Sequence, residues 1–296
     1  MARWSAGKIV GIVFLCIFIL LIFSGSCYIA GLVSAGLGGT SYGLGDSVYE
    51  IRMEGLISAD RYTGLFLGES VTPEDIINQL DEAESNPNVK AILIRVNSPG
   101  GSPAASQEIY EEVKKAKKPV VVSVSETCAS GAYYISSAAD MIVANRSSSV
   151  GSIGVIMRLP NFEGLYEQLG VKYTTIKQGE FKDVGSTDRP ITEEEKRMLE
   201  AQLKELYDQF ISDVADSRSM ETSKVRELAT GWVFLGTEAL ELGLIDKIGN
   251  YKDAINTAAE LGGIEGEPVV IRQEAGYSLI DLIFNYYLNS LIEKIF

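Results

Sequence analysis

The chain has 296 residues, of which 46% are hydrophobic and 22% are charged, and this composition is ordinary for a globular protein of one or two structural units. The formal net charge of −14 argues against a nucleic-acid partner, which would need a basic surface. Histidine is absent, which excludes Ser/His/Asp triads, Cys/His dyads and His-ligated zinc or haem sites. Proton transfer therefore has to use carboxylates, Lys, Tyr, Cys or water.

An apolar segment precedes the rest of the chain. Residues 9–29 carry no charge and are nearly all apolar or small, and about 20 such residues can cross the hydrocarbon core of a bilayer. Arg3 and Lys8 come before this segment, so the positive-inside rule predicts a cytoplasmic N-terminus and an extracytoplasmic remainder. We expect residues 1–30 to be a cytoplasmic stub and a single-pass anchor in the cell membrane, and residues 31–46 to be a flexible Gly/Ser-rich linker. A cleaved signal peptide is the alternative interpretation.

The cysteines do not support a disulfide framework. Only three are present, with Cys16 and Cys27 in the apolar segment and Cys128 far along the chain, so the stability of the fold must come from a hydrophobic core. Lipidation of Cys27 is a weak alternative, because the leucine expected three residues before it is missing.

Strands and helices alternate from residue 47 onwards. The first strand, 48–54, alternates apolar and charged residues, which predicts a half-buried strand with Glu50 on the face away from the core. The elements that follow are a helix that begins at Pro73 with Thr72 as its N-cap, a strand at 91–96, a helix at 104–117, strands at 119–125 and 141–144, a helix at 161–169, a strand at 171–176, and a long helix from Thr192 to about Ser217. Strands that alternate with long helices are typical of βαβ units, so we predict an α/β fold in which residues 47–273 form the globular domain.

Two glycine-containing motifs follow buried strands. Asn97–Gly101 (NSPGG) comes directly after the strand 91–96, and two glycines after a proline allow a turn that leaves N–H groups open to an anion or oxyanion. An ordinary strand-to-helix turn is the alternative. Residues 128–134 (CASGAYY) follow the next strand, and Ser130 has only small neighbours there, so a substrate carbonyl could approach its hydroxyl. The alternative is a serine that only caps a helix.

Lys182 is the candidate base for such a serine in a chain without histidine. It lies in the segment Gln178–Asp183 (QGEFKD), after the strand expected at 171–176. A lysine in water has a pKa of about 10.4 and is protonated at neutral pH, so the site would have to desolvate the amine before it could accept a proton from Ser130. An ordinary surface lysine is the alternative.

Taken together, these motifs resemble the SppA-type signal peptide peptidases. Asn97–Gly101, Ala129–Tyr134, Gly151–Val155 (GSIGV) and Gly179–Asp183 occur in the order and spacing of that family, and the resemblance covers about residues 47–260. Members are membrane-anchored Ser/Lys serine proteases with a fold related to the Clp protease and crotonase families. The resemblance implies that fold, and a serine endopeptidase that hydrolyses remnant signal peptides and other extended apolar peptides near the membrane without a cofactor or metal.

The resemblance also implies a role for each site residue. Ser130 is the expected nucleophile, Lys182 the general base, and Ser152 the hydroxyl that orients the lysine. The N–H groups of Gly101 and Gly131 are expected to form the oxyanion hole. A homo-oligomer whose subunits share substrate grooves is implied as well.

Other interpretations compete with the peptidase. A crotonase-like acyl-CoA enzyme shares the fold and the oxyanion hole, but a Ser/Lys pair does not suit it. A Clp-type protease would need a histidine. In a membrane-tethered scaffold without catalytic activity, Ser130 would only cap a helix. Cys128 as the nucleophile would lack a partner for its thiolate, and we expect it to be a small buried residue.

Residues 274–296 are predicted to form an amphipathic C-terminal helix. Its apolar residues recur at four-residue spacing and are Leu279, Ile283, Tyr287, Leu291 and Ile295. Such a stripe would be buried on the core of its own domain, against a neighbouring subunit, or on the membrane surface. The single cation Lys294 weakens the last alternative.

Overall fold

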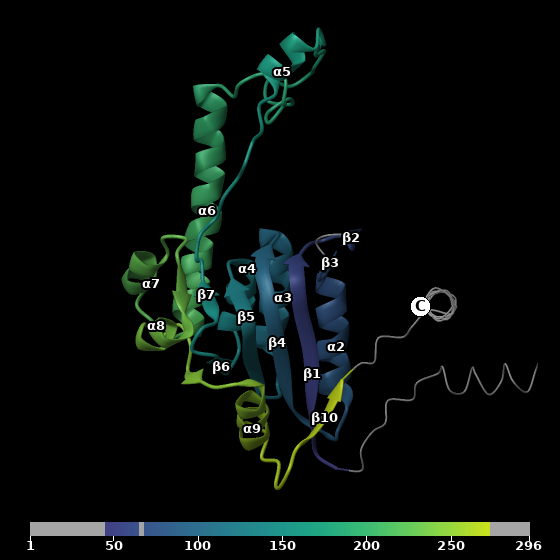
Figure 1. The fold of residues 1–296 in the computed structure, drawn as a ribbon, viewed down its shortest axis with the longest axis vertical. Helices are drawn as coiled ribbons and strands as arrows, with labels where there is room; N and C mark the ends of the chain where they lie inside the picture. The colour runs from purple at the N-terminus through teal and green to yellow at the C-terminus, as the bar shows by residue number, and fades with distance from the viewer. Residues whose placement is uncertain (1–44, 65–67, 273–296) are drawn as a thin grey trace, which may run out of the picture. The chain divides into compact units, whose positions relative to one another are not determined.

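The motifs around Gly101, Ser130 and Ser152 lie at one edge of a mixed sheet, where several parallel strands end (Figure 1). The computed structural model describes residues 45–64 and 68–272, and Leu44–Val270 forms one compact unit. The candidate anchor at 9–29 and the C-terminal helix expected at 274–296 lie outside the described residues. Within the described part of the chain, no helix is both long and apolar enough to cross a bilayer.

Strands and helices alternate along much of the described chain. The strands are β1 (Ser47–Ile57), β2 (Thr63–Gly64), β3 (Gly68–Glu69), β4 (Val89–Gly101), β5 (Val120–Ala129), β6 (Met141–Ala144), β7 (Ser149–Gly151), β8 (Val233–Leu235), β9 (Lys247–Ile248) and β10 (Val269–Arg272). The helices are α2 (Pro73–Ser85), α3 (Pro103–Lys115), α4 (Gly131–Ser137), α5 (Glu163–Gln168), α6 (Glu193–Ser217), α7 (Thr222–Leu228), α8 (Gly236–Glu241) and α9 (Tyr251–Leu261).

The order of the strands explains why the motifs meet. The eight-stranded sheet runs β10-β1-β4-β5-β6-β9, with β7 paired to β5 and β8 paired to β7. β4, β5 and β7 are parallel to their partners β1, β4 and β5, whereas β8 is antiparallel to β7. The carboxyl ends of parallel strands lie at the same edge of a sheet, so Gly101, Ala129 and Gly151 come together there. This architecture confirms the predicted α/β class.

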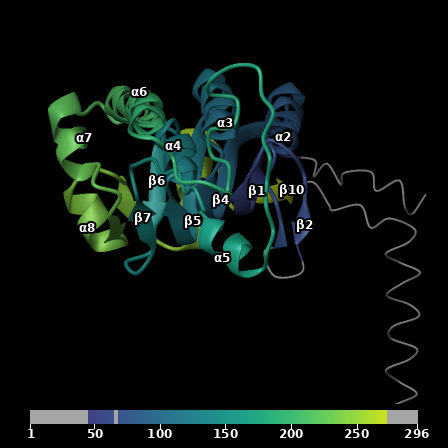
Figure 2. The ribbon, with the colours of Figure 1, turned by 90° about the horizontal axis from the view of Figure 1, so that it is seen from above.

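Helices cover both faces of the sheet. On one face lie α2, α3 and α4 (Figure 2), and the Tyr49 hydroxyl on β1 donates a hydrogen bond to Glu82 on α2 at 2.8 Å. On the other face α9 packs its alanines, such as Ala254 and Ala258, against a buried cluster that includes Leu93 and Val121. Because helices cover both faces of the sheet, its central strands carry apolar residues on both of their faces.

The structure corrects the expected exposure of β1. Glu50 is only 1% exposed, although alternation along the strand placed it on the face away from the core. Arg52 donates a hydrogen bond from Nε to Glu50 at 2.9 Å, and the Tyr251 hydroxyl donates a second one. Tyr251 begins α9, so the helix that covers this face also satisfies the carboxylate that it buries.

Capping boxes are present at the start of two helices. Thr72 caps α2 with Asp75 as the reciprocal acid, and Thr192 caps α6 with Glu195 in the same role. In each box the threonine hydroxyl accepts the third helical N–H and the acid accepts the N–H of the threonine. The capping box therefore determines the residue at which α6 begins, and the helix continues to Ser217.

Residues 155–192, here called the arm, extend away from the sheet along the N-terminal half of α6, with α5 at its far end (Figure 1). The strand expected at 171–176 is not formed, and all of its residues are exposed. The β-branched and aromatic residues of this segment favour a strand, but no strand among the described residues pairs with it. The strand propensity of residues 171–176 therefore does not lead to a strand.

We predict that Gly236→Ala lowers the free energy of unfolding by about 2 kcal/mol or more, the range for overpacking. A Cβ at this position would lie 2.0 Å from the main-chain oxygen of Asn145, which cannot move aside easily. Gly164→Ala is the matched control, because a Cβ there has no atom within 4 Å, and its effect should stay within about 1 kcal/mol. Urea unfolding measures both variants. A Gly236→Ala protein as stable as the wild type would contradict this packing.

Candidate active site

Ser130 lies at a sharp turn between β5 and α4. Its backbone has φ 53° and ψ −124°, a conformation that costs energy for any residue with a side chain and that clusters at functional sites. The Ser130 N–H donates a hydrogen bond to the Gly151 carbonyl at 2.8 Å, and the Tyr134 N–H donates one to the Ser130 carbonyl at 2.9 Å. The Ser130 hydroxyl makes no capping hydrogen bond to α4. Its side chain does not therefore act as a helix cap.

Two glycines beside the serine bring main-chain N–H groups together. The segment Asn97–Gly101 is the irregular end of β4, and a Cβ on Gly101 would lie 1.9 Å from the Ile57 carbonyl oxygen. A Cβ on Gly131 would lie 2.3 Å from Ser106 Oγ and 3.4 Å from Gly101 N. Gly131 opens α4, so its N–H has no acceptor within the helix. Two neighbouring amide groups of this kind suit a developing oxyanion.

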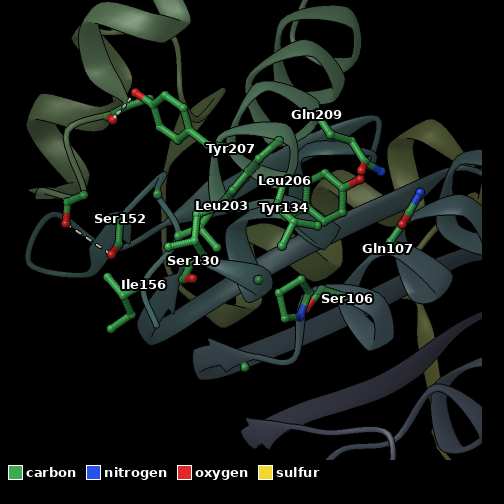
Figure 3. A pocket seen from close by; sticks show the side chains of 18 of the residues that line it. Ser106, Gln107, Ser130, Tyr134, Ser152, Ile156, Leu203, Leu206, Tyr207 and Gln209 are labelled. Atoms are coloured by element: carbon green, nitrogen blue, oxygen red, sulfur yellow. Dashed lines mark hydrogen bonds between the residues drawn. The ribbon is translucent and has the colours of Figure 1, made fainter. Parts of the chain in front are cut away.

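Ser152 lies just after β7, with a left-handed φ of 51°. Its hydroxyl donates a hydrogen bond to the Gly231 carbonyl at 3.2 Å, and its N–H donates one to the Trp232 carbonyl at 2.8 Å. The hydroxyl proton is thereby directed at the main chain, which leaves the oxygen lone pairs available to accept a hydrogen bond from an amine. Ser130 and Ser152 line the same pocket (Figure 3).

The pocket that contains Ser130 has a volume of about 760 Å³. Gly101, Gly131 and Ser152 also line it. Its apolar lining includes Val155, Ile156, Leu203, Leu206 and Phe210 (Figure 3). The site therefore combines a serine hydroxyl, two main-chain amides and an apolar surface that fits a hydrocarbon side chain.

Lys182 is the one expected site residue that does not line this pocket. It lies in a turn of the arm, where its N–H donates a hydrogen bond to the Gly179 carbonyl at 3.2 Å, and its side chain is exposed. A single copy thus brings together Ser130, Gly101, Gly131 and Ser152 but leaves Lys182 on the arm.

An ion-pair cluster, missed in the sequence, surrounds the turn that carries Lys182. We call Lys177, Asp183, Arg189 and Glu195 the Arg189 cluster. Hydrogen bonds from Arg189 and Lys177 hold the pKa of Asp183 well below its usual range. A hydrogen bond from Arg189, supported by the Thr192 N–H, lowers the pKa of Glu195 to about 2. No local signal in the sequence connected Glu195 with Arg189.

Tyr134 was also missed as a pocket residue. Its ring stacks on Tyr110 with centroids 4.6 Å apart, and its hydroxyl donates a hydrogen bond to Asp213 at 2.5 Å. Burial first, and then the bond to Asp213, raise the pKa of Tyr134 far above its ordinary value. The phenol therefore stays neutral and serves as a fixed wall of the pocket. Asp213 is on α6, so no pattern within the CASGAYY motif could reveal the contact.

Cys128 is buried, as expected from the sequence. It is 0% exposed, and its thiol lies 3.2 Å from the Ser136 hydroxyl. Burial raises the pKa of the Cys128 thiol to about 12, so the thiolate that a nucleophile requires is absent at neutral pH.

Two known family models match this chain. Residues 112–265 match the model of Peptidase family S49, and residues 59–150 match the model of Clp protease. The chain belongs to peptidase family S49. The resemblance to the signal peptide peptidases is confirmed, and membership places the chain among the serine proteases.

Several individual relatives support the family. A protein of Methanocaldococcus jannaschii named as a protease is 40% identical over 209 residues, which are 70% of this chain and 67% of the relative. A protein of Enterococcus faecium named as a signal peptide peptidase SppA is 38% identical over 71% of this chain and 62% of its own length. Protease 4 of Haemophilus influenzae is 36% identical over 65% of this chain, but the match covers only 32% of that protein. The matches thus span about two thirds of the first two relatives and about one third of the third.

We predict that the Lys182 turn and the start of α6 loosen in acid before the sheet does. The pKa of Glu195 is lowered from 4.5 to about 2, so the stability that its ion pair contributes is complete above about pH 4.5 and is lost as the pH falls toward 2. Hydrogen exchange, corrected for intrinsic rates, should show residues 180–196 losing protection in this window while β4 keeps it. Simultaneous loss in both segments would show that the pair does not control the arm.

Proposed function

We propose that this chain is a membrane-anchored serine endopeptidase that uses Ser130 and Lys182 to hydrolyse remnant signal peptides and other extended apolar peptides. The proposal rests on the strained backbone turn at Ser130. This serine lines an apolar pocket beside the amides of Gly101 and Gly131.

The proposed reaction has two acyl transfers. Ser130 Oγ attacks the scissile carbonyl while its proton passes to the neutral amine of Lys182. The C–N bond then breaks, the amine returns the proton to the leaving nitrogen, and an ester to Ser130 remains. Water attacks the ester with the same amine as base, and the proton returns to the serine oxygen. N–H groups of Gly101 and Gly131 stabilise both tetrahedral oxyanions, by about 2.7 to 4 kcal/mol for each donor.

The pocket supports a preference for apolar peptides. Leu203, Leu206 and Ile156 line it, and Ile156 is 76% exposed. An extended substrate with a hydrocarbon side chain would cover these residues and remove apolar area from water. Residues 9–29, the candidate anchor, would hold this site beside a bilayer, where such peptides are released.

In this proposal, Lys182 reaches Ser130 from a neighbouring copy of the chain. The arm exposes many large apolar side chains, which are Ile156, Met157, Leu159, Phe162, Leu165, Leu169, Val171, Tyr173 and Ile176. Exposed apolar surface of this extent is typical of an interaction site. A second copy that covered it would desolvate the arm and give Ser130 the base that its own pocket lacks, with the Ser152 hydroxyl as its acceptor.

We predict that Ser130→Ala abolishes peptide hydrolysis, whereas Cys128→Ala keeps it within about twofold, because the buried thiol takes no part in acyl transfer. The assay uses the full chain in detergent with an apolar fluorogenic peptide. Circular dichroism of both variants checks that they fold. Full activity in Ser130→Ala would show that another group is the nucleophile, and absence of hydrolysis by the wild type would favour the scaffold interpretation.

We also predict that Lys182→Ala and Lys182→Arg are both inactive, since a guanidinium cannot give up its proton to act as a base. Mixing equal amounts of Ser130→Ala and Lys182→Ala subunits should restore about a quarter of wild-type activity, because half of the sites have an intact serine and random pairing gives half of those an intact lysine from the next copy. A double variant mixed with Ser130→Ala is the control and should stay inactive.

Two outcomes would contradict this assignment. Mixtures that stay inactive, although both subunits are in one oligomer, would mean that Lys182 serves the serine of its own chain. Activity in Lys182→Ala together with its loss in Lys204→Ala would move the base to α6, because Lys204 also lines the pocket, where it pairs with Asp208.

A further inference from the structure

The Arg189 cluster has an ordered geometry in an otherwise exposed arm. Arg189 donates from Nη2 and Nη1 to the two carboxylate oxygens of Glu195 at 2.6 and 2.9 Å. The same guanidinium donates from Nε to Asp183 at 3.2 Å. One arginine therefore joins two carboxylates, through the forked geometry that a lysine cannot reproduce.

Three members of the cluster are more buried than the segment that precedes them. The side chains of Glu195, Asp183 and Arg189 are 4%, 15% and 28% exposed, whereas every residue from 167 to 180 is exposed. Exposed ion pairs contribute little because water and side-chain entropy oppose them, but a shielded pair with two aligned hydrogen bonds holds its geometry. The cluster thus fixes the position of the segments that it joins.

The segments that the cluster joins are the start of α6 and the turn that carries Lys182. Glu195 is locked to the helix, since the Thr192 N–H donates to its carboxylate at 2.8 Å and its own N–H donates to the Thr192 hydroxyl at 3.2 Å. Asp183 follows Lys182 directly in the chain. On the other side of the turn, Lys177 Nζ donates to the Glu180 carbonyl at 2.7 Å and to Asp183 at 2.5 Å.

We propose that Arg189 is a positioning residue for Lys182, the proposed catalytic base. Through Asp183 and Glu195 it fixes the Lys182 turn to the start of α6, and this sets the direction in which the lysine side chain points from the arm. This inference rests on the proposed function. Arg189 contacts neither substrate nor Ser130 in this role. It acts by restricting the base to one orientation, and a displacement of about 1 Å at a reacting group can cost about 100-fold in rate.

The experiment compares Arg189→Ala with Arg197→Ala in the full chain. Arg197 is an exposed arginine on the same end of α6, so its removal changes the surface charge without touching the turn. We expect Arg189→Ala to lower kcat by about 10-fold to 100-fold, with KM and oligomer size unchanged. Arg197→Ala should keep kcat within about twofold of the wild type.

Two further measurements separate positioning from a merely structural role. Low millimolar guanidinium, well below denaturing concentrations, should partly restore kcat of Arg189→Ala by occupying the vacated site, and it should leave Arg197→Ala unchanged. Asp183→Asn keeps the side-chain volume and weakens only the link to the turn, so it should reduce kcat in the same direction. This variant tests the inference even if Arg189→Ala fails to fold.

Wild-type kcat in Arg189→Ala, or a loss of activity that follows only KM or dissociation of the oligomer, would overturn the inference. Failure of the proposed function gives a different result. If Lys182→Ala remains active, the lysine is not the base at all. If Lys182→Ala is inactive and Arg189→Ala is fully active, only the positioning role is wrong.

Discussion

The site depends on the close approach of two main-chain segments at the edge of the sheet. The end of β4 packs on Ile57 through Gly101, and the start of α4 packs on Ser106 through Gly131, with no space for a Cβ at either glycine. The strained backbone of Ser130 persists because its N–H is bonded to Gly151 on the neighbouring strand β7. The pairing of buried strands thus supplies the free energy that a reactive conformation costs.

The arm obeys a different constraint. It buries few side chains of its own, so its shape depends on the rigidity of α6 and on the Arg189 cluster at the start of that helix. An apolar core inside the arm would bury the same apolar side chains that the arm exposes. Directional ion pairs hold the turn without using that surface, and they leave Leu169 and Ile176 available for a neighbouring molecule.

Features determined by neighbours in the sequence could be predicted, and those determined by distant partners could not. Both capping boxes, the α/β class and the motifs around Gly101 and Ser130 follow from residues within one turn or strand end. The burial of Glu50 depends on Tyr251, 201 residues away. The strand expected at 171–176 failed because strand propensity needs a partner that the fold does not provide.

The proposed dyad also explains why the base is found on an exposed arm. A lysine amine surrounded by water holds its proton at neutral pH, and only loss of that water makes it a base. In a single copy, Lys182 and the apolar side chains of the arm are exposed together. Burial of those side chains by a second copy would remove water from the amine in the same step. The association that completes the site would then also activate its base, so an isolated copy would hold a nucleophile and an oxyanion hole without hydrolysing peptides.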